Sequence, residues 1–240
     1  MPLRALVGDQ LAVIERPNRK RLRLEVASKS PAVLQELKNQ FGGRIEKLRR
    51  DWLQRSLRRK TKPIKIGSRK LIIPAGAAFG TGEHATTAMS LRLLERVFRD
   101  WGAQVHPPDL VVDLGTGSGI LALAGKLLGA KRVIGIDNDP IAIWTAKQNA
   151  RLNKVRGVQF LVSDVRRWRL SLDVDIVTAN LFSELLISIL PRLKHAKWLI
   201  LSGILRAHER DLTRALRQNK IDSIDARRRG KWVAILAARR

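Results

Sequence analysis

The distribution of apolar residues divides the chain near residues 60–75. Beyond this point, short apolar runs alternate with longer segments in which apolar residues recur every three or four positions, a pattern typical of strands that alternate with helices. Such strands form a mostly parallel, doubly wound α/β sheet covered by helices on both faces. The turn residues Arg228-Arg229-Gly230 predict that the last two strands form an antiparallel hairpin at one edge. The expected strands are 110–114, 132–136, 158–162, 174–179, 198–201, 221–227 and 231–237, and the expected helices are 86–99, 120–128, 140–152, 181–193 and 206–217.

The region before this division predicts a small α+β unit. Residues 21–26 alternate like a strand, residues 31–41 have helical spacing, and residues 44–51 can return as a second strand. This βαβ-type unit is too short for a robust core of its own. We therefore expect three regions: a small basic N-terminal unit over 1–60 that binds substrate or a partner, a linker and covering loop over 61–85, and a larger domain over 86–240.

Positive charge is the outlying feature of the composition, since the 240 residues carry a net charge of +26. Residues 1–70 hold 20 basic and 6 acidic side chains, a net charge of +14. Such a field attracts polyanions. The basic N-terminal region therefore predicts contact with RNA or the ribosome, and a basic surface that only confers solubility is the alternative interpretation.

Several site classes and locations are disfavoured by the composition. The chain has no cysteine and its four histidines lack metal-ligand spacing, so we expect no disulfide and no metal. No apolar run approaches the roughly 20 residues of a membrane span. Asp9, Glu15 and Arg16 also interrupt the apolar stretch that a secretory signal needs. We expect a cytoplasmic protein without membrane contact.

A glycine-rich loop follows the expected strand 110–114 and opens the helix that begins at Ile120. It contains Asp113, Gly115 and Gly117, and its glycines let the backbone approach a ligand closely. The dinucleotide motif requires a glycine three residues after the second one, where this chain has Ile120. No Gly-Lys-Ser/Thr follows either, so the spacing disfavours both a dinucleotide site and a P-loop.

Polar residues end the next strands of the predicted sheet. Asp137 lies 22 residues after Gly115, where a carboxylate can accept both ribose hydroxyls of an adenosyl group. Asp164 can accept from the adenine amino group, and Asn180 can face a sulfonium and orient an incoming amine. A helix N-cap is the alternative role for each acid, and a simple turn for Asn180. Their succession at strand ends favours a methyl-donor pocket.

A second glycine-rich loop, residues 78–87, lies directly before a helix and includes Phe79 and Thr87. We expect this loop to lie over the cofactor pocket. Thr86 or Thr87 can also cap the helix that follows.

These motifs together resemble the ribosomal protein L11 methyltransferase family. The resemblance rests on residues 78–87, the loop 113–119, residues 135–140 and Ala179-Asn180-Leu181, and it extends over about residues 62–240. It implies a seven-stranded methyltransferase sheet, S-adenosylmethionine as cofactor, and methylation of lysine and N-terminal amines of a ribosomal protein. The expected cofactor contacts are Phe79, Thr87, Asp113, Gly115, Gly117, Asp137, Asp164 and Asn180, and Asn180 is also the expected catalytic residue.

The chain departs from the family pattern in three places. Glu83-His84-Ala85-Thr86-Thr87 replaces Thr followed by His-Pro-Thr-Thr, and Ile73-Pro74-Ala75-Gly76 replaces a segment that normally holds an acidic residue. The family's N-terminal substrate-recognition domain is also longer than the region available here.

Other functions stay open on the sequence alone. The charge favours an RNA methyltransferase, although the chain lacks an Asn-Pro-Pro-Tyr/Phe-type motif and has no tyrosine for stacking on bases. A lysine methyltransferase for a metabolic protein, such as an electron-transfer flavoprotein, is a variant of the protein-amine methyltransferase that the resemblance implies. A ribosome-binding module that keeps the fold only as a scaffold is a third.

Overall fold

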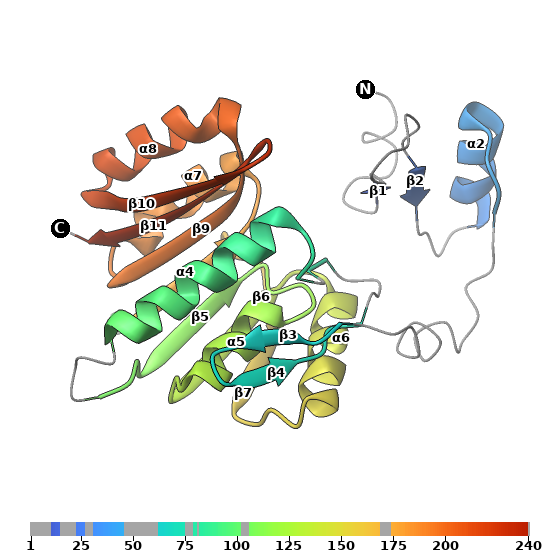
Figure 1. The fold of residues 1–240 in the computed structure, drawn as a ribbon. Coiled ribbons are helices and arrows are strands. Elements are labelled where there is room, and N and C mark those ends of the chain that lie inside the picture. Colours follow the sequence, from blue (N-terminus) through green and yellow to red (C-terminus); the bar gives the residue numbers. More distant parts are fainter. Residues whose placement is uncertain are drawn as a thin grey trace. The chain divides into compact units, whose positions relative to one another are not determined.

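The computed structural model describes residues 11–14, 23–26, 31–45, 62–74, 79–80, 82–101, 106–168 and 174–239. The chain forms two compact units, Met1–Trp52 and Leu53–Arg240. In the smaller unit, β1 (Leu11–Ile14) pairs antiparallel with β2 (Arg23–Val26), and α2 (Pro31–Phe41) follows (Figure 1). The expected strand 21–26 and helix 31–41 are thus present, whereas β1 was not predicted. Most of the strand expected over 44–51 lies outside the described residues, and Arg44 and Ile45 are irregular.

The larger unit contains one seven-stranded sheet with the order β10-β11-β9-β8-β5-β6-β7. Its strands are β5 (Leu110–Leu114), β6 (Arg132–Asp137), β7 (Val158–Val162), β8 (Ile176–Asn180), β9 (Trp198–Leu205), β10 (Ile221–Arg229) and β11 (Trp232–Arg239). Its helices are α4 (Ala85–Trp101), α5 (Ile120–Leu128), α6 (Pro140–Leu152), α7 (Ser183–Leu193) and α8 (Glu209–Gln218), with the 3-10 turn η2 (Arg206–His208) before α8. Strands β5 to β9 run parallel, and β11 pairs antiparallel with both β9 and β10. The predicted doubly wound sheet and its edge hairpin are confirmed.

Strand β9 extends to Leu205, four residues beyond the end that the apolar pattern predicts. The pairing with β11 shifts register between Val233 and Ala234, and Gly203 is left as the extra residue opposite this step. Gly203 has φ 84° and a Cβ there would collide with the backbone carbonyl of Leu181. The position therefore needs glycine, and the bulge lets the strand continue past what looks like a turn.

A short hairpin lies in the segment expected to be a linker. It consists of β3 (Ile64–Ile66) and β4 (Arg69–Leu71), joined by Gly67-Ser68. Ile66 and Leu71 are buried in the core of the larger unit. Polar contacts fix the hairpin as well, because the backbone N–H of Gly67 donates to Glu95 Oε1 at 3.0 Å.

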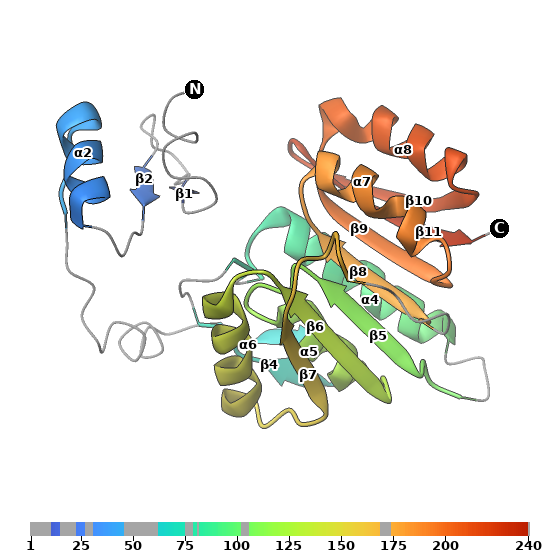
Figure 2. The same ribbon diagram turned by 180° about the vertical axis from the view of Figure 1, so that it is seen from behind.

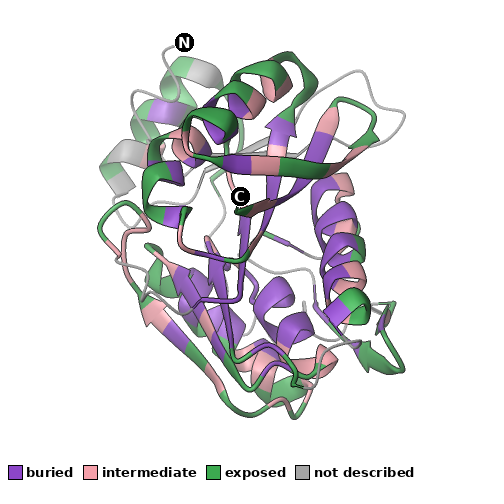
Figure 3. Cartoon of the chain, turned by 90° about the vertical axis from the view of Figure 1, so that its left-hand side faces the viewer, coloured by how far each residue is buried: buried purple, intermediate pink, exposed green. Residues whose placement is uncertain are grey.

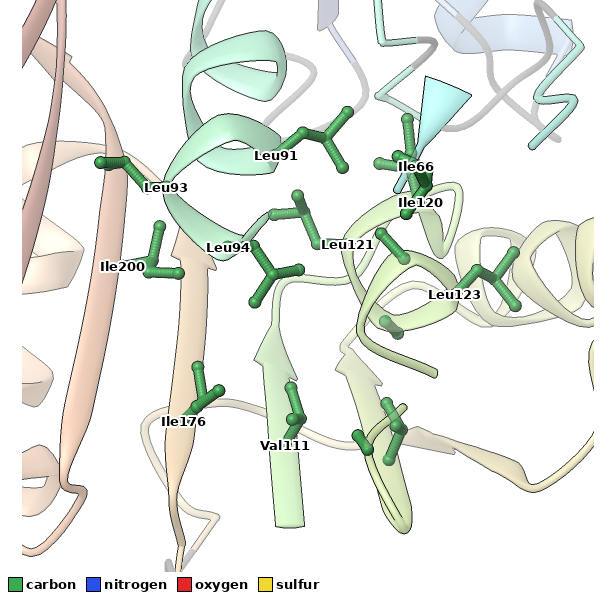
Figure 4. Close-up of a cluster of buried hydrophobic side chains, with 14 of the residues drawn as sticks. Ile66, Leu91, Leu93, Leu94, Val111, Ile120, Leu121, Leu123, Ile176 and Ile200 are labelled. Carbon is green, nitrogen blue, oxygen red and sulfur yellow. The ribbon is translucent and has the colours of Figure 1, made fainter. Parts of the chain in front are cut away.

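Two apolar layers cover the sheet. One contains buried residues of α4, α5 and α6 together with Val111, Ile176 and Ile200 of the sheet. Figure 4 shows Leu94 and Leu121 of this layer lying beside those strands. The other layer contains α7 and α8, which pack against the opposite face, as the view from behind shows (Figure 2). Buried residues accordingly concentrate on the strands and on the inner faces of the helices (Figure 3).

Candidate functional site

The residues singled out by sequence spacing share one row at the carboxyl edge of the sheet. Leu114 pairs with Ile136 of β6 on one side and with Ala179 of β8 on the other. The next position in each strand brings Gly115, Asp137 and Asn180 side by side. Ligands bind at this edge in open parallel sheets, so the register itself assembles the predicted site.

Asp137 is bonded to the glycine loop. Its Oδ2 accepts the backbone N–H of Gly117 at 2.9 Å, and its Oδ1 accepts the N–H of Asp139 at 3.0 Å. The alternative role as helix N-cap belongs to Asp139, whose Oδ1 accepts the N–H of Ile141 at 2.8 Å. Asp137 is only half-buried, and each carboxylate oxygen can accept a second hydrogen bond. It can therefore receive ribose hydroxyls in its present position.

Gly117 brings the glycine loop against the covering loop. Its φ is 51°, and a Cβ at this position would lie 2.7 Å from the backbone oxygen of Phe79. The same oxygen accepts the N–H of Ser118 at 2.9 Å, while Ser118 Oγ donates to the carbonyl of Gly80 at 2.6 Å. Asn149 of α6 supports the loop from behind by donating to the carbonyl of Ser118 at 2.8 Å. Sequence reasoning missed Asn149, which has no motif of its own.

Asp113 is buried and holds the start of the glycine loop. Its Oδ1 accepts the hydroxyl of Thr178 at 2.6 Å, and its Oδ2 accepts the hydroxyl of Thr116 at 2.7 Å and the N–H of Ala122 at 3.2 Å. Burial raises the pKa of Asp113 to about 6, against the opposing effect of these three donors. The geometry gives this carboxylate a positioning role, and a direct cofactor contact stays a prediction. Thr178, which sequence reasoning missed, is a polar residue within the apolar strand β8 and lies opposite Asp113 in the β5–β8 register.

The start of α4 is capped by the residue before it. The N–H of Ala88 donates to the carbonyl of His84 at 3.0 Å, and the ring Nδ1 of His84 lies 2.7 Å from Thr86 Oγ1. His84 thus occupies the position that we expected Thr86 or Thr87 to take. Its ring also lies edge-on between those of Phe79 and Trp232, with centroid distances of 5.3 and 5.2 Å. These edge-on contacts hold the ring of Phe79, in the loop over residues 78–87, against the ring of His84.

Thr87 and Asn180 meet between α4 and the end of β8. The amide Nδ2 of Asn180 donates to Thr87 Oγ1 over a long contact of 3.5 Å, and Thr87 is fully buried. The amide oxygen of Asn180 therefore points away from Thr87. Within the part of the chain that the structure describes, no group donates to that oxygen. The Asn180 oxygen can therefore accept a hydrogen bond from an N–H of a substrate amine.

Asp164 initiates a turn two residues after β7. Its Oδ1 accepts the N–H of Arg166 at 2.8 Å, and its backbone carbonyl accepts from Trp168. The alternative weighed against adenine binding was a helix N-cap; Asp164 instead starts a turn over residues 165–167, and adenine recognition by Asp164 stays a prediction. Ser163 connects this turn to the site, because its N–H donates to the carbonyl of Asp137 at 2.9 Å.

Apolar side chains are exposed next to the row of site residues. The exposed fractions are 58% for Phe79, 54% for Val162 and 63% for Phe182. Val162 ends β7 and pairs with Asp137, and Phe182 follows Asn180 by two residues. A flat, apolar ring needs such surroundings next to the ribose site. Together with the close glycine approach and the free capacity of Asp137, they fit an adenosyl cofactor.

Other site classes find no counterpart among the described residues. No group of three or more histidine, aspartate and glutamate side chains is arranged there to hold a metal ion. None of the described helices has both the length and the apolar character needed to cross a membrane.

The ribosomal protein L11 methyltransferase family model matches residues 61–240. A ribosomal protein L11 methyltransferase from Symbiobacterium thermophilum is 34% identical over an alignment of 247 positions, gaps included, that covers 90% of this chain and 75% of that protein. A second, from Heliobacterium modesticaldum, is 36% identical over 199 residues, which cover 74% of this chain and 61% of that protein. For a relative from Bacillus cereus the match covers 51% of its length. The chain thus spans between about half and three quarters of these relatives.

Solved structures give the same result. The ribosomal protein L11 methylase from Lactobacillus delbrueckii subsp. bulgaricus is 31% identical, with a TM-score of 0.60, and the match covers 70% of this chain and 83% of that one. The magnesium protoporphyrin IX methyltransferase from Synechocystis, solved with bound SAH, has a TM-score of 0.51 over 65% of this chain and 85% of that one. At 20% identity this second likeness shows the fold alone.

Proposed function

Because the chain belongs to the ribosomal protein L11 methyltransferase family, we propose that it methylates lysine and N-terminal amines of ribosomal protein L11. The enzyme class is that of the family: an S-adenosylmethionine-dependent methyltransferase. The observation that carries the proposal is the row of Gly115, Asp137 and Asn180 at the carboxyl edge, with Thr87 facing Asn180. The family's cofactor and acceptor motifs meet there.

The cofactor would be held by groups that the structure already orients. When bound, S-adenosylmethionine supplies an electrophilic methyl group on a sulfonium. Asp137 accepts the ribose hydroxyls, while glycine at positions 115 and 117 lets the loop pack against Leu181 and the Phe79 carbonyl and so fixes it beside Asp137. Phe79 covers the pocket from the second loop. Asp164, at the end of the adjacent strand, is the proposed partner of the adenine amino group.

Asn180 orients the acceptor amine. Its Nδ2 faces Thr87, so its amide oxygen can accept one N–H of the amine and direct the nitrogen lone pair towards the methyl group. An ammonium has no such lone pair and must first lose its proton. Burial in an apolar cleft lowers the pKa of a lysine, and the exposed apolar side chains of Phe79 and Phe182 would provide such surroundings once a substrate covers them. The proton passes to bulk water before the transfer, and the methyl group is released from its sulfur with S-adenosylhomocysteine as the leaving group, so no strong base is required.

The basic N-terminal region is proposed as a contact to the ribosomal partner. Its net charge of +14 over residues 1–70 supports an electrostatic attraction to RNA or to the ribosome around the acceptor protein. A ribosomal substrate would place the reaction in the cytoplasm. The division into an N-terminal unit over 1–60, a connecting segment over 61–85 and a catalytic domain over 86–240 remains part of this proposal.

The test is methyl transfer from labelled cofactor to purified ribosomal protein L11, to ribosomal RNA and to a lysate. We expect label in L11 that is removed by protease and not by RNase, with mass spectrometry placing it on lysine or the N-terminus. The Asn180→Ala variant, which keeps the cofactor contacts of Asp137, is the control for catalysis. Label found only in RNA would identify an RNA methyltransferase, and label in another protein would redirect the substrate assignment. Failure of the folded protein to bind cofactor would identify a scaffold.

A further inference from the structure

An arginine-rich groove lies on the larger unit, among the elements that follow β9. It is an open depression of about 660 Å³ formed by residues of η2, α8 and β10. Arginine supplies five of the eight residues that line it, and glutamate supplies one. The remaining two are threonine and glutamine, so the lining contains neither an apolar nor an aromatic side chain.

Helix α8 produces this arrangement by its spacing. Leu212, Ala215 and Leu216 are buried and pack α8 against the sheet. The opposite face therefore carries Arg210, Arg214 and Arg217, which are four and three residues apart and exposed. They cover about 10 Å along the helix axis, at 1.5 Å per residue. The array is thus built into a packed element and does not depend on a loose segment.

Most of these positive charges have no acidic partner. Arg228 donates to the two carboxylate oxygens of Glu209 through two of its three guanidinium nitrogens, Nε and Nη2. Arg214 Nη1 lies 3.5 Å from Asp211 Oδ1. Among the residues that the structure describes, no ion pair joins a carboxylate to Arg206, Arg210 or Arg217. Like charges held close together on one face repel one another, and an anionic partner would relieve that repulsion.

We propose that this groove, lined by Arg206, Arg210, Arg214, Arg217 and Arg228, binds the phosphate backbone of folded RNA. Guanidinium groups match phosphate oxygens with two parallel hydrogen bonds. A duplex carries a phosphate charge at roughly every 1.7 Å of its axis, so a 10 Å row of arginines can contact several at once. The absence of aromatic side chains from the lining disfavours stacking on single-stranded bases.

The groove composition also separates RNA from a protein partner. Protein interfaces are built around buried apolar and aromatic anchors, and the groove offers none. Its position agrees with a role near the acceptor. Arg206 directly follows the end of β9, the strand whose Ser202 pairs with Asn180. The RNA would therefore lie along α8 and reach the carboxyl edge at which the methyl transfer is proposed.

The test compares RNA affinity of the full chain and of two variants that each lose three positive charges. R210Q/R214Q/R217Q removes the row on α8, and K147Q/R151Q/R156Q removes three exposed cations at and just beyond α6. Binding of a fluorescein-labelled RNA hairpin is followed by anisotropy between 50 and 200 mM KCl. We expect the α8 variant to bind the RNA about 10-fold or more weakly. We also expect the slope of log affinity against log salt to become shallower by about 2 to 3, since each phosphate contact contributes about 0.9 to its magnitude. The α6 variant should stay within about 3-fold.

A charge-conserving variant guards against a merely structural effect. R210K/R214K/R217K should keep the salt slope, because lysine retains the phosphate attraction while losing the bidentate geometry. Equal losses in the two α8 variants, equal losses in the α8 and α6 glutamine variants, or unchanged binding by R210Q/R214Q/R217Q would each overturn the proposal. Displacement of the RNA by polyglutamate at equal charge would overturn it as well, because it would identify a site for acidic protein. None of these residues belongs to the methyl-transfer site, so methylation of an isolated acceptor protein should be unchanged.

Discussion

Asp113 should give the protein a specific dependence of stability on pH. Its carboxyl is buried, with 1% of its surface exposed, and burial raises its pKa to about 6. In the unfolded chain the ordinary value of about 3.9 applies. The folded state therefore keeps this proton to higher pH than the unfolded state does. The associated stability is fully present below about pH 4 and is lost as the pH rises through 6.

The size of the effect follows from the shift. About two pKa units at 1.36 kcal/mol each amount to roughly 3 kcal/mol of unfolding free energy between pH 4 and pH 7. The Asp113→Asn variant cannot ionise and lacks this component, although its amide matches the donors Thr178, Thr116 and Ala122 less well. Its absolute stability is therefore lower at acidic pH, and its deficit relative to the native chain should shrink by about 3 kcal/mol towards pH 7.

The measurement is urea unfolding followed by tryptophan fluorescence, for both proteins at intervals between pH 4 and pH 7.5. Asp109→Asn is the matched control, because Asp109 is exposed and a hydrogen bond from Lys131 lowers the pKa of its carboxyl. Its contribution has the opposite sign: it is present above the unfolded value and lost as the pH falls. A difference between native and Asp113→Asn proteins that does not vary with pH would refute the assignment of a buried, proton-binding carboxyl at this position.

The cofactor site yields three further predictions. Asp137→Ala should weaken cofactor binding measured by calorimetry about 100-fold or more, since hydrogen bonds to a charged group contribute about 1.5–3 kcal/mol each; unchanged affinity in the folded variant would show the ribose assignment to be wrong. Asn180→Ala should lower kcat about 10- to 100-fold while cofactor Kd changes little, and an equal loss in both would argue against orientation of the acceptor. Gly117→Ala should lose cofactor affinity because its Cβ would meet the Phe79 carbonyl. Gly230→Ala is the control: this glycine also has a positive φ, 59°, but no atom lies within 4 Å of its Cβ position, so cofactor affinity should not change. Equal losses in the two variants would refute the idea that the contact with the Phe79 carbonyl requires glycine at position 117.

The sequence predicts the larger unit well because its strands are buried on both faces. This holds for the central strands: the apolar run 110–114 coincides with β5, whose five residues are all buried. The edge strand β7 has one buried residue, and its bounds 158–162 were nevertheless predicted from its apolar content. The hairpin β3–β4 was missed because each strand has only three residues and half of their side chains are exposed. Its turn, Gly67-Ser68 between alternating residues, was nevertheless a usable hairpin signal. Strand β1 is a run of four apolar residues, which was a usable strand signal but is too short to distinguish a strand from a helix by its pattern.

The site is predicted from spacing to the extent that the sheet register determines it. Gly115, Asp137 and Asn180 follow three strand ends, and parallel pairing places three such ends in one row. The supporting residues depend on packing between distant elements, which spacing does not encode. Thr178 reaches Asp113 across a strand pair, and His84 takes the capping position through its ring.

The two carboxylates on β5 and β6 illustrate why motif membership alone does not assign a role. Asp113 and Asp137 belong to adjacent strand ends and both were expected to contact the cofactor. Asp113 is buried, and its two oxygens accept hydrogen bonds from Thr178, Thr116 and Ala122. Asp137 is half-buried, accepts the N–H of Gly117, and can accept further hydrogen bonds. One fixes the glycine loop from inside the sheet, and the other fixes it from the ligand side. A ligand that bonds to Asp137 would therefore act on a loop whose start is already held by Asp113, so under the proposed ribose contact Asp137 would couple cofactor binding to the order of the loop.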